Sequence, residues 1–332
     1  MRTVPSKHLF PVLRRLSDGA FHSGEAVAAS LGLSRASVFN AISDARHLGY
    51  AIHAVRGRGY RLPQPPEWLD EAAIRQALGT HAASFALDLR DCVDSTNRLA
   101  FAAASQDGAD GLVVAAEYQS AGRGRRGRHW LAGPGESLLF SWVCRFECGP
   151  DGLSGLSLVA GLAVVQALAR ANGVAATLKW PNDVLVGGRK LAGILIEVQG
   201  DAHGPAFAVI GVGINLRLPR ELRQGIDQAV VDLDELGAGT GRNHLLAACL
   251  LELSGAVAAF RQSGFAVFRA AWQAHDAYAG HRVRLLGSDG RSVTGVSAGV
   301  DANGAYLLRD ASGDVQAFNG GELSLRLDGA AR

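Results

Sequence analysis

Three prolines stand within the five residues LPQPP, at positions 62–66, and divide this chain of 332 residues. Each proline fixes its own φ and lacks the amide hydrogen that a strand or helix would use, so a cluster of prolines ends the element before it. We therefore expect a linker at residues 63–69, with a head domain at residues 1–62 and a body after it. The length also favours two or three domains over one.

The head is basic, whereas the body is not. Residues 1–62 carry nine Lys or Arg and three Asp or Glu, a net charge of +6. The whole chain has a net charge of +2, so the remaining residues carry −4. A basic module joined to a mildly acidic body is the asymmetry expected of a DNA-binding domain fused to another kind of domain.

Residues 23–49 of the head predict two short helices that meet at a tight turn. Ser23 and Ser34 can each cap a helix, and Gly32 can adopt the positive φ that ends the first helix. The next residues, YAIHAVRGRGYRLP at positions 50–63, predict a two-stranded hairpin with three arginines. We therefore expect a winged helix-turn-helix domain. A helical pair that serves only for dimerisation is the alternative, and the basic charge favours DNA binding.

The predicted DNA contacts lie on the exposed side of the second helix and on the hairpin. Val38, Ile42 and Ala45 share the buried side of this helix, at a spacing of i, i+4 and i+7. The opposite side is polar. The predicted DNA-binding residues are Ser34, Arg35, Asn40, Ser43, Arg46, Arg56 and Arg58.

Apolar, β-rich runs follow one another in the body, which we expect to form one domain at residues 70–275. They are GLVVAAEYQ, SLLFSWVCRF, ATLKWPNDVLV, RKLAGILIEVQ and FAVIGVGINLRL. Helical segments are expected at 95–106, 153–172 and 242–262. Because several strands follow one another through short turns, a mixed sheet with helices is favoured over strict β-α-β alternation.

The last part of the chain, residues 276–332, predicts a separate small β-barrel. Its short strands alternate with the turn sequences SDG, NG and SGD. The fold class predicted for the whole chain is therefore α+β with several domains.

No segment predicts export or insertion into a membrane. No apolar run reaches the roughly 18 uncharged residues that a membrane helix needs, and arginines interrupt the N-terminal segment. The four cysteines form no CxxC pair, which favours a reducing compartment. We expect a cytoplasmic protein with no membrane partner.

The stretch QSAGRGRRGRHW, residues 119–130, contains four arginines and three glycines. It satisfies the GxGxxG pattern of dinucleotide-binding proteins, but a Gly-Pro-Gly turn and a strand follow where that fold needs a helix. A nucleic-acid patch is a second alternative, although the loop lies in the acidic body, and a solvated charge run is a third. Arginine without lysine favours bidentate capture of phosphate or carboxylate. The glycines favour a loop that closes over its ligand.

Further polar stretches fall at the ends of predicted elements. They are DSTN at residues 94–97, KWPND at residues 179–183, Lys190 at the start of a strand, and Asn215 at the end of GVGIN. Alone, each has a structural explanation: Ser95 can cap a helix, Lys190 can be a solvated hairpin charge, and Asn215 can turn the chain.

Together, and in this order, these stretches resemble the bacterial family of bifunctional biotin–protein ligases and biotin operon repressors. The resemblance covers nearly the whole chain. It includes FHSGE and LGLSR in the head, DSTN, EYQSAGRGRRGRHW, KWPND, RKLAGILIE and GVGIN in the body, and GGELSLR near the end. It implies a class II synthetase-like biotin/lipoate ligase fold for the central domain. One departure is SVFNAIS in the second head helix, because relatives often have more basic or polar residues at the positions of Phe39–Ala41.

The resemblance implies an ATP-dependent ligase that uses Mg²⁺ and forms biotinyl-5′-AMP from biotin. Its partner would be the biotin carboxyl carrier domain of acetyl-CoA carboxylase, which receives biotin on a lysine. The adenylate would also be a corepressor that promotes a homodimer, and the homodimer would bind biotin operator DNA. The alternatives are a lipoate–protein ligase and a ligand-sensing regulator without ligase activity.

The resemblance also implies roles for individual residues. Lys190, Arg123 and Arg125 would be catalytic. The biotin-binding residues would be Ser95, Thr96, Asn97, Gln119, Arg123, Gly124, Arg125 and Lys190. The residues that bind ATP or Mg²⁺ would be Arg125, Arg126, Trp130, Asn182, Asp183, Asn215 and Arg326, with Asp183 as the ligand of the metal.

Overall fold

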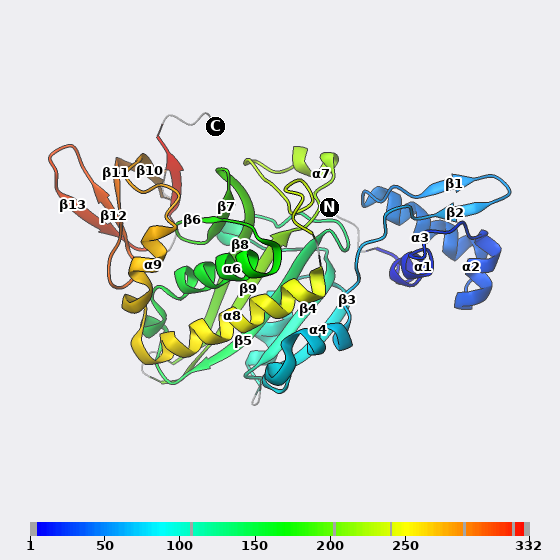
Figure 1. Cartoon of the computed structure of the whole chain (residues 1–332), viewed down its shortest axis with the longest axis horizontal. Coiled ribbons are helices and arrows are strands. Elements are labelled where there is room, and N and C mark those ends of the chain that lie inside the picture. The colour runs from blue at the N-terminus through cyan, green and yellow to red at the C-terminus, as the bar shows by residue number, and fades with distance from the viewer. Residues whose placement is uncertain are drawn as a thin grey trace.

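Three groups of elements succeed one another along the long axis of the molecule (Figure 1). The structure, a computed structural model, describes residues 5–106, 109–201, 204–239, 241–287, 290–320 and 323–328. The N-terminal group and the C-terminal sheet lie at opposite ends, with a large sheet and its helices between them. The domain limits predicted at residues 62, 69 and 275 stay predictions.

The N-terminal group is a winged helix-turn-helix. Its elements are α1 Leu9–Arg15, α2 Gly24–Leu31, α3 Arg35–His47, and the antiparallel hairpin of β1 His53–Val55 with β2 Gly59–Arg61. The hydroxyl oxygen of Ser23 accepts from the amide of Ala26 at 3.0 Å, and that of Ser34 accepts from the amide of Ser37 at 3.0 Å. Gly32 ends α2 with φ 64°. The predicted caps and turn are confirmed.

A buried ion pair fixes the linker to the body. The guanidinium of Arg242 and the carboxylate of Glu117 lie 2.5 Å apart, with 2% and 1% of their side chains exposed. Glu117 also accepts from the amide of Leu69 at 2.7 Å. On the side of the head, the indole of Trp68 donates to the hydroxyl of Ser17 at 2.9 Å. The linker is therefore bonded to both of the groups that it joins.

Seven strands form the central sheet, in the order β3-β4-β5-β9-β8-β7-β6. They are β3 Ala86–Val93, β4 Leu112–Gln119, β5 Ser137–Phe146, β6 Thr177–Lys179, β7 Asp183–Val186, β8 Arg189–Gly200 and β9 Ala206–Asn215. Strands β3 and β4 are parallel, and the other neighbouring pairs are antiparallel. The predicted mixed sheet is confirmed.

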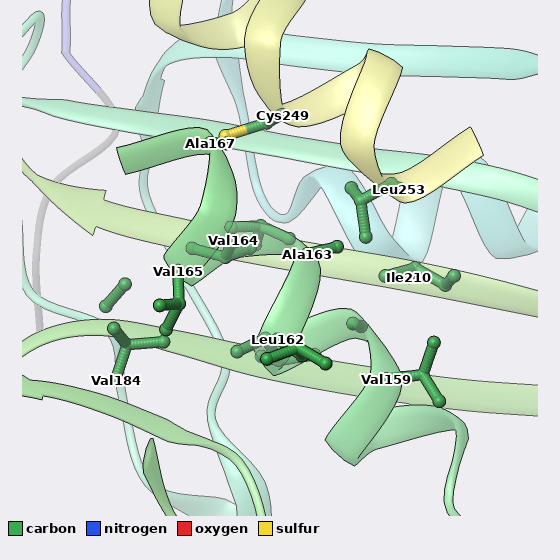
Figure 2. Close-up of a cluster of buried hydrophobic side chains, with 14 of the residues drawn as sticks. Val159, Leu162, Ala163, Val164, Val165, Ala167, Val184, Ile210, Cys249 and Leu253 are labelled. Atoms are coloured by element: carbon green, nitrogen blue, oxygen red, sulfur yellow. The ribbon is translucent and has the colours of Figure 1, made fainter. Parts of the chain in front are cut away.

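One face of the sheet packs against the long helices α6 Leu156–Asn172 and α8 Arg242–Ser263 (Figure 1). Figure 2 shows part of this core, with Val165 from α6, Val184 from β7, Ile210 from β9 and Leu253 from α8 in one cluster. By length and composition alone, the stretches Pro150–Asn172 and Arg242–Ser263 could each cross a membrane. Burial in this core explains their apolar composition.

The opposite face of the sheet carries helix α5 Thr96–Ala104. Successive strand residues point to opposite faces. Val143 of β5 and Val209 of β9 pack with Ala100 of α5, whereas their neighbours Cys144 and Ile210 belong to the core beneath α6 and α8. The odd-numbered positions of these two strands therefore face α5.

The C-terminal sheet is antiparallel, in the order β13-β12-β11-β10-β14. Its strands are β10 Arg282–Leu286, β11 Ser292–Val300, β12 Tyr306–Arg309, β13 Val315–Phe318 and β14 Ser324–Leu327. Within the described part of this region no pairing joins β13 to β14, so the sheet is open where a closed barrel was expected. Three of the four residues of β13 are exposed, which leaves little apolar surface to draw the two edges together.

Three further helices complete the body. They are α4 Glu71–Leu78, α7 Arg220–Gln224 and α9 Arg269–Ala274. Helix α4 packs on α8 through its buried residues Ile74 and Leu78. Neither α4 nor α1 of the head was among the elements predicted from the sequence.

Candidate functional site

Three glycines form the floor of a cavity on the α5 face of the sheet. Gly193 lies on β8, and Gly211 and Gly213 lie on β9. Val212 and Ile214, between and after the two glycines of β9, belong to the core on the other face. In GVGIN, the residues therefore alternate: the glycines face the cavity, and Val212 and Ile214 face the core.

The side chains of Trp130 and Asn97 occupy the space that these glycines leave. A Cβ atom added at Gly213 would lie 2.8 Å from Cε2 of Trp130, and one added at Gly211 would lie 1.9 Å from Oδ1 of Asn97. The indole ring also has Nζ of Lys190 at 5.6 Å from its centroid, within the range of a cation–π attraction. The buried indole N–H has no hydrogen-bond partner among the described residues, so a ligand can accept from it.

The arginine–glycine loop folds back on itself as a short hairpin. The amide of Trp130 donates to the carbonyl oxygen of Gly122 at 2.9 Å, and the amide of Gly124 donates to that of Arg128 at 2.8 Å. Arg126, at the tip, has φ 59°, a left-handed conformation that is uncommon for residues other than glycine. The loop therefore presents its arginines from a defined turn.

A buried hydrogen-bond network lines one end of the cavity. Thr96 donates from its amide and its hydroxyl to Oε1 of Gln119, at 2.6 and 3.0 Å. The hydroxyl oxygen of Ser141 lies 2.8 Å from Oγ1 of Thr96 and 2.6 Å from Oδ1 of Asn97, and its one hydrogen can be donated to either acceptor. Nδ2 of Asn97 donates to the carboxylate of Glu197 at 3.0 Å. A network with both hydroxyl and amide groups can exchange hydrogen bonds with a ligand that carries donors and an acceptor together.

Two lysines and one carboxylate form a second, charged group in the cavity. Nζ of Lys190 lies 2.6 Å from Oδ1 of Asp183, and Nζ of Lys179 lies 3.6 Å from Oδ2. Burial alone would raise the pKa of Asp183, but the two ammonium groups hold it below its ordinary value. Burial lowers the pKa of Lys179, and the carboxylate of Asp183 opposes that shift. Two cations against one anion leave a surplus of positive charge, which favours an anionic ligand.

Two arginines of the loop have different partners. Arg125 donates to Oδ1 of Asn182 at 3.3 Å and to the carbonyl oxygen of Gly320. Arg123 donates to the carboxylate of Glu197 at 3.1 Å, with about half of its side chain exposed. Arg125 thus links the loop to the KWPND turn and to the C-terminal region, whereas Arg123 links it to β8.

The structure brings nearly all of the predicted ligand-binding residues to one cavity. Its lining includes Ser95, Thr96, Asn97, Gln119, Arg123, Gly124, Arg125, Arg126, Trp130, Asn182, Asp183, Lys190 and Asn215. Arg326, on β14, is not part of this lining, although Ser324 and Leu325 are. The individual role of each residue stays a prediction.

Ser95 and Asn215, two of the predicted ligand-binding residues, also form hydrogen bonds that stabilise the fold around the cavity. The hydroxyl of Ser95 caps α5 by accepting from the amide of Arg98 at 3.4 Å. Nδ2 of Asn215 donates to the carbonyl oxygens of Lys190 and Val231, at 3.3 and 3.1 Å. Asn215 therefore positions the backbone of the residue whose ammonium group faces Asp183.

Ser141, Lys179 and Glu197 take part in the site and were not predicted. Lys179 belongs to the KWPND stretch, so its position beside Asp183 was a usable signal. Ser141 is embedded in the apolar run SLLFSWVCRF, and only the pairing of β5 with β4 and β9 places it beneath α5. Glu197 lies on β8 and likewise reaches Asn97 only through the folded sheet.

A magnesium site at Asp183 fits the structure only in part. Across the described residues, no group of three or more His, Cys, Asp or Glu side chains comes together to hold a metal. Asp183 is a single carboxylate, and each of its oxygens contacts a lysine. Mg²⁺ commonly takes one or two carboxylates and completes its shell with water and substrate phosphates. Asp183 and the Asn182 amide fit a metal that arrives with a nucleotide.

The predicted DNA-binding residues of the head differ in their surroundings. Arg35, Asn40, Arg56 and Arg58 are exposed. Arg46 is also exposed, but its guanidinium donates to the carbonyl oxygen of Ile52 at 2.9 Å. Ser34 caps α3, and Ser43 is partly buried. The guanidinium of the exposed Arg58 also lies 4.3 Å from the ring centroid of Phe21. Their contacts with DNA stay predictions.

A basic winged helix-turn-helix joined to a cavity that is lined by arginine, lysine and hydrogen-bonding groups defines a class of protein that combines a DNA-binding head with a small-molecule site. Residues 9–61 match an HTH domain, residues 89–215 match the biotin/lipoate A/B protein ligase family, and residues 278–326 match the biotin protein ligase C-terminal domain. The three matches follow the three groups of elements.

The bifunctional ligase/repressor BirA of Escherichia coli (strain K12) is 37% identical over 324 residues, which cover 98% of each chain. The biotin–acetyl-CoA-carboxylase ligase of Mycobacterium tuberculosis is 36% identical over 269 residues, which cover 78% of this chain and 96% of that protein. Among solved structures, the biotin protein ligase from Aquifex aeolicus in complex with biotin and ATP is similar with a TM-score of 0.62 and 30% identity, over 73% of this chain and 99% of that one. The chain belongs to the family of bifunctional biotin ligases and repressors.

Proposed function

We propose that this chain is an ATP-dependent biotin–protein ligase that also represses transcription of biotin genes. One observation carries the ligase: in a single cavity, the hydrogen-bond network lies near Gly211, in the middle of β9, and the charged group lies near Asn215, at the end of that strand. Along β9, Gly211 lies under Asn97, Gly213 lies under Trp130, and Asn215 bonds the backbone of Lys190. Four residues of extended strand span about 14 Å.

The geometry suits a substrate with a polar ring at one end and a carboxylate at the other. The ureido ring of biotin has two N–H donors and one carbonyl acceptor. The network of Thr96, Gln119 and Ser141 offers the matching acceptors and donors. The carboxylate of biotin would then lie at the end of the cavity that contains Lys190, near the indole of Trp130.

In the first step, an oxygen of the biotin carboxylate attacks the α-phosphorus of ATP. A P–O bond forms, the bond to the β-phosphate breaks, and pyrophosphate leaves with its electron pair, so that biotinyl-5′-AMP remains. Both reactants are anions, so the residues must neutralise charge and align the two groups. Alignment can supply about 7–11 kcal/mol, and each hydrogen bond to a charged group contributes about 1.5–3 kcal/mol. Lys190 and Arg125 supply these charged donors in this proposal.

In the second step, the amine of the acceptor lysine attacks the carbonyl carbon of biotinyl-5′-AMP. An amide bond forms, the bond to the phosphate oxygen breaks, and AMP leaves while the amine loses a proton. No covalent intermediate on the enzyme is needed, because the anhydride is already activated. The hairpin of residues 119–130 would protect that anhydride from water, and we expect it to become more resistant to proteolysis when biotin and ATP are present.

Mg²⁺ would enter with the nucleotide and offset the charge of its phosphates. Asp183 and Asn182 are the residues that would contact it. Asp183 keeps its carboxylate ionised through the two lysines, which is the form a hard cation requires.

The test of the ligase mixes the protein with biotin, Mg-ATP and a biotin carboxyl carrier domain. We expect the intact mass of the carrier to rise by one biotinyl group. Lipoate in place of biotin separates the alternative of a lipoate–protein ligase, since lipoate has no ureido ring. Modification of the carrier by lipoate and not by biotin would contradict the proposal.

The role of Lys190 is tested by the exchange of pyrophosphate into ATP. Lys190→Gln removes a charged donor at the reacting groups, so we expect the biotin-dependent exchange to fall by at least about 100-fold. Arg189→Gln is the matched control, because Arg189 is the preceding residue and pairs with Glu235 outside the cavity. Normal exchange in the Lys190 variant, with the fold intact, would remove this residue from the mechanism.

The repressor activity of this proposal depends on the head and on the adenylate. Biotinyl-5′-AMP would be the corepressor, and binding it would promote a homodimer that contacts two halves of an operator. The exposed cations Arg35, Arg56 and Arg58 support contacts with phosphates. A gel shift with the upstream region of the biotin genes should show binding that tightens when biotin and Mg-ATP are added. Binding that ignores both ligands would contradict the corepressor role.

A further inference from the structure

Phe39 is a large apolar side chain in the middle of the exposed face of α3. It is 62% exposed, although the neighbouring residues Val38 and Ala41 are buried in the core of the head. Isolated apolar residues on a surface are common, so exposure alone says little. The surroundings of Phe39 are more informative.

The face that carries Phe39 is polar and cationic. Residues Arg35, Phe39, Ser43 and His47 recur every fourth position along α3, so they form one strip. A shallow groove beside this strip is lined by Phe39, Ile42, Ser43, Arg46 and His47. The strip therefore combines one apolar ring with hydrogen-bonding groups and positive charge.

No carboxylate of α3 faces this strip. Asp44 is the single acidic residue of the helix, and its carboxylate accepts from the amide of Ser6 at 2.9 Å. The exposed hairpin adds the cations Arg56 and Arg58. A helix strip that carries cations and no carboxylate of its own is complementary to a polyanion, and it is less suited to a second copy of the same strip.

Duplex DNA offers such a polyanion together with an apolar group. In the major groove, each thymine presents a C5-methyl group, which apolar side chains contact. Adenine, the partner of thymine, presents N6 and N7 to an Asn side chain such as that of Asn40, the residue after Phe39. The two adjacent side chains could thus read one A·T pair or two neighbouring pairs.

We propose that Phe39 is a specificity-determining residue that contacts the C5-methyl group of a thymine in the operator. This inference rests on the proposed repressor function and adds to it the base that this position reads. It also explains why a phenylalanine can replace the polar or basic residues that relatives often have there, since a methyl group requires no hydrogen-bond partner.

The experiment compares two duplexes of the upstream region of the biotin genes, one made with thymidine and one with deoxyuridine. The second lacks only the C5-methyl groups. Binding is measured with biotin and Mg-ATP for the unaltered protein and for Phe39→Ala. We expect deoxyuridine to weaken binding of the unaltered protein about four-fold for each methyl contact that is lost. Duplexes with a single deoxyuridine then identify which thymine the unaltered protein contacts through its methyl group. At that thymine, we expect the Phe39→Ala variant to bind the thymidine and deoxyuridine duplexes with equal affinity.

Two controls separate the possible results. Val267→Ala removes another exposed apolar side chain, 60% exposed in the body, and should leave both affinities unchanged. Phe39→Leu should retain part of the preference for thymine.

If the unaltered protein binds specifically but Phe39→Ala keeps the full preference, Phe39 does not read the methyl group. If the unaltered protein does not prefer this region over a scrambled duplex, the repressor function itself is wrong. If Phe39→Ala changes self-association without any effect of deoxyuridine, the residue belongs to a protein contact, and our inference is overturned.

Discussion

At the scale of single residues, the glycines of β8 and β9 decide what the cavity can hold. Gly213→Ala would place a Cβ atom 2.8 Å from the indole of Trp130, so the ring must leave the floor on which it lies. We expect the affinity for biotin to fall by about ten-fold or more, because the indole of Trp130 and the ammonium group of Lys190 are no longer held in position. Isothermal titration calorimetry with biotin measures this affinity.

The control for that variant is Gly255→Ala on α8. Gly255 has no atom within 4 Å of an added Cβ, and alanine is the better helix former by about 1 kcal/mol. This variant should bind biotin normally and be slightly more stable. Equal affinities in both variants would mean that the indole does not depend on the glycine floor.

The cysteines differ in burial, and their reactivity should differ accordingly. Burial raises the pKa of the Cys144 and Cys249 thiols well above the ordinary value of about 8.5. Because only the thiolate reacts, and a raised pKa lowers its fraction at a given pH, these two should resist alkylation at about pH 8. Burial also raises the pKa of the half-buried Cys92, whereas Cys148 is exposed.

We therefore expect iodoacetamide to modify Cys148 first, as seen by intact mass and peptide mapping over time. Modification of all four cysteines is expected only in guanidinium chloride. Rapid labelling of Cys249 in the native protein would show that α8, which carries it, does not stay packed on the core formed with α6 and the sheet.

At the scale of elements, the junction of linker, β4 and α8 depends on the pair of Arg242 and Glu117. Without Arg242, the buried carboxylate of Glu117 keeps only the more distant Arg14, at 3.9 Å, as a cationic partner among the described residues. Breaking a buried pair in this way costs about 3–5 kcal/mol. We expect Arg242→Met to lower the free energy of unfolding by about this amount, measured by guanidinium denaturation. The double variant Arg242→Met with Glu117→Gln removes both charges, so it should recover at least half of the loss. A double variant as unstable as the single one would show that the ion pair itself, and not the unpaired carboxylate, matters.

The elements predicted from the sequence are those with local signals. The caps Ser23 and Ser34 and the turn at Gly32 act within a few residues, so helices α2 and α3 could be predicted. Helix α4 has only two buried residues, and its apolar pattern is too short to stand out beside the linker. Whether the C-terminal strands close depends on the contact between two edges far apart in the chain, which turn sequences do not encode.

The same distinction holds for the site. Motifs with several unusual residues in a row, such as the arginine–glycine loop and KWPND, contain residues that line the cavity, although many other lining residues lie outside these motifs. Ser141 carries no such signal, because it is embedded in an apolar run, and Glu197 ends the stretch RKLAGILIE, where nothing local indicates that it meets Asn97. Their partners Thr96 and Asn97 are 45 and 100 residues away, and only the assembled sheet brings them together.

At the scale of the whole molecule, the C-terminal region takes part in the cavity, which Ser324 and Leu325 of β14 line directly. Trp180, in the KWPND turn, lies 5.2 Å from Tyr306 between ring centroids and donates to the carbonyl oxygen of Gly304 at 3.1 Å. Arg125 of the loop bonds Gly320. The C-terminal sheet therefore helps to position both the turn and the loop, and the site depends on two of the three groups of elements.

The division of charge between head and body predicts how DNA binding depends on salt. Each cation that neutralises a phosphate releases a counterion, so the slope of log K against log salt is about −0.9 for each contact. We expect Arg35→Gln to make that slope shallower by about 0.9 per protomer, since Arg35 is exposed on the cationic face of α3. Fluorescence anisotropy with labelled operator at a series of KCl concentrations measures the slope.

Arg170→Gln serves as the matched control for the salt experiment, because it removes the same charge from the body. Arg170 lies in the last turn of α6 and pairs with Glu252 of α8, far along the chain from the head. Its slope should equal that of the unaltered protein. If both variants changed the slope alike, the protein would respond to DNA through its total charge, and the basic head would not be the surface that meets the phosphates.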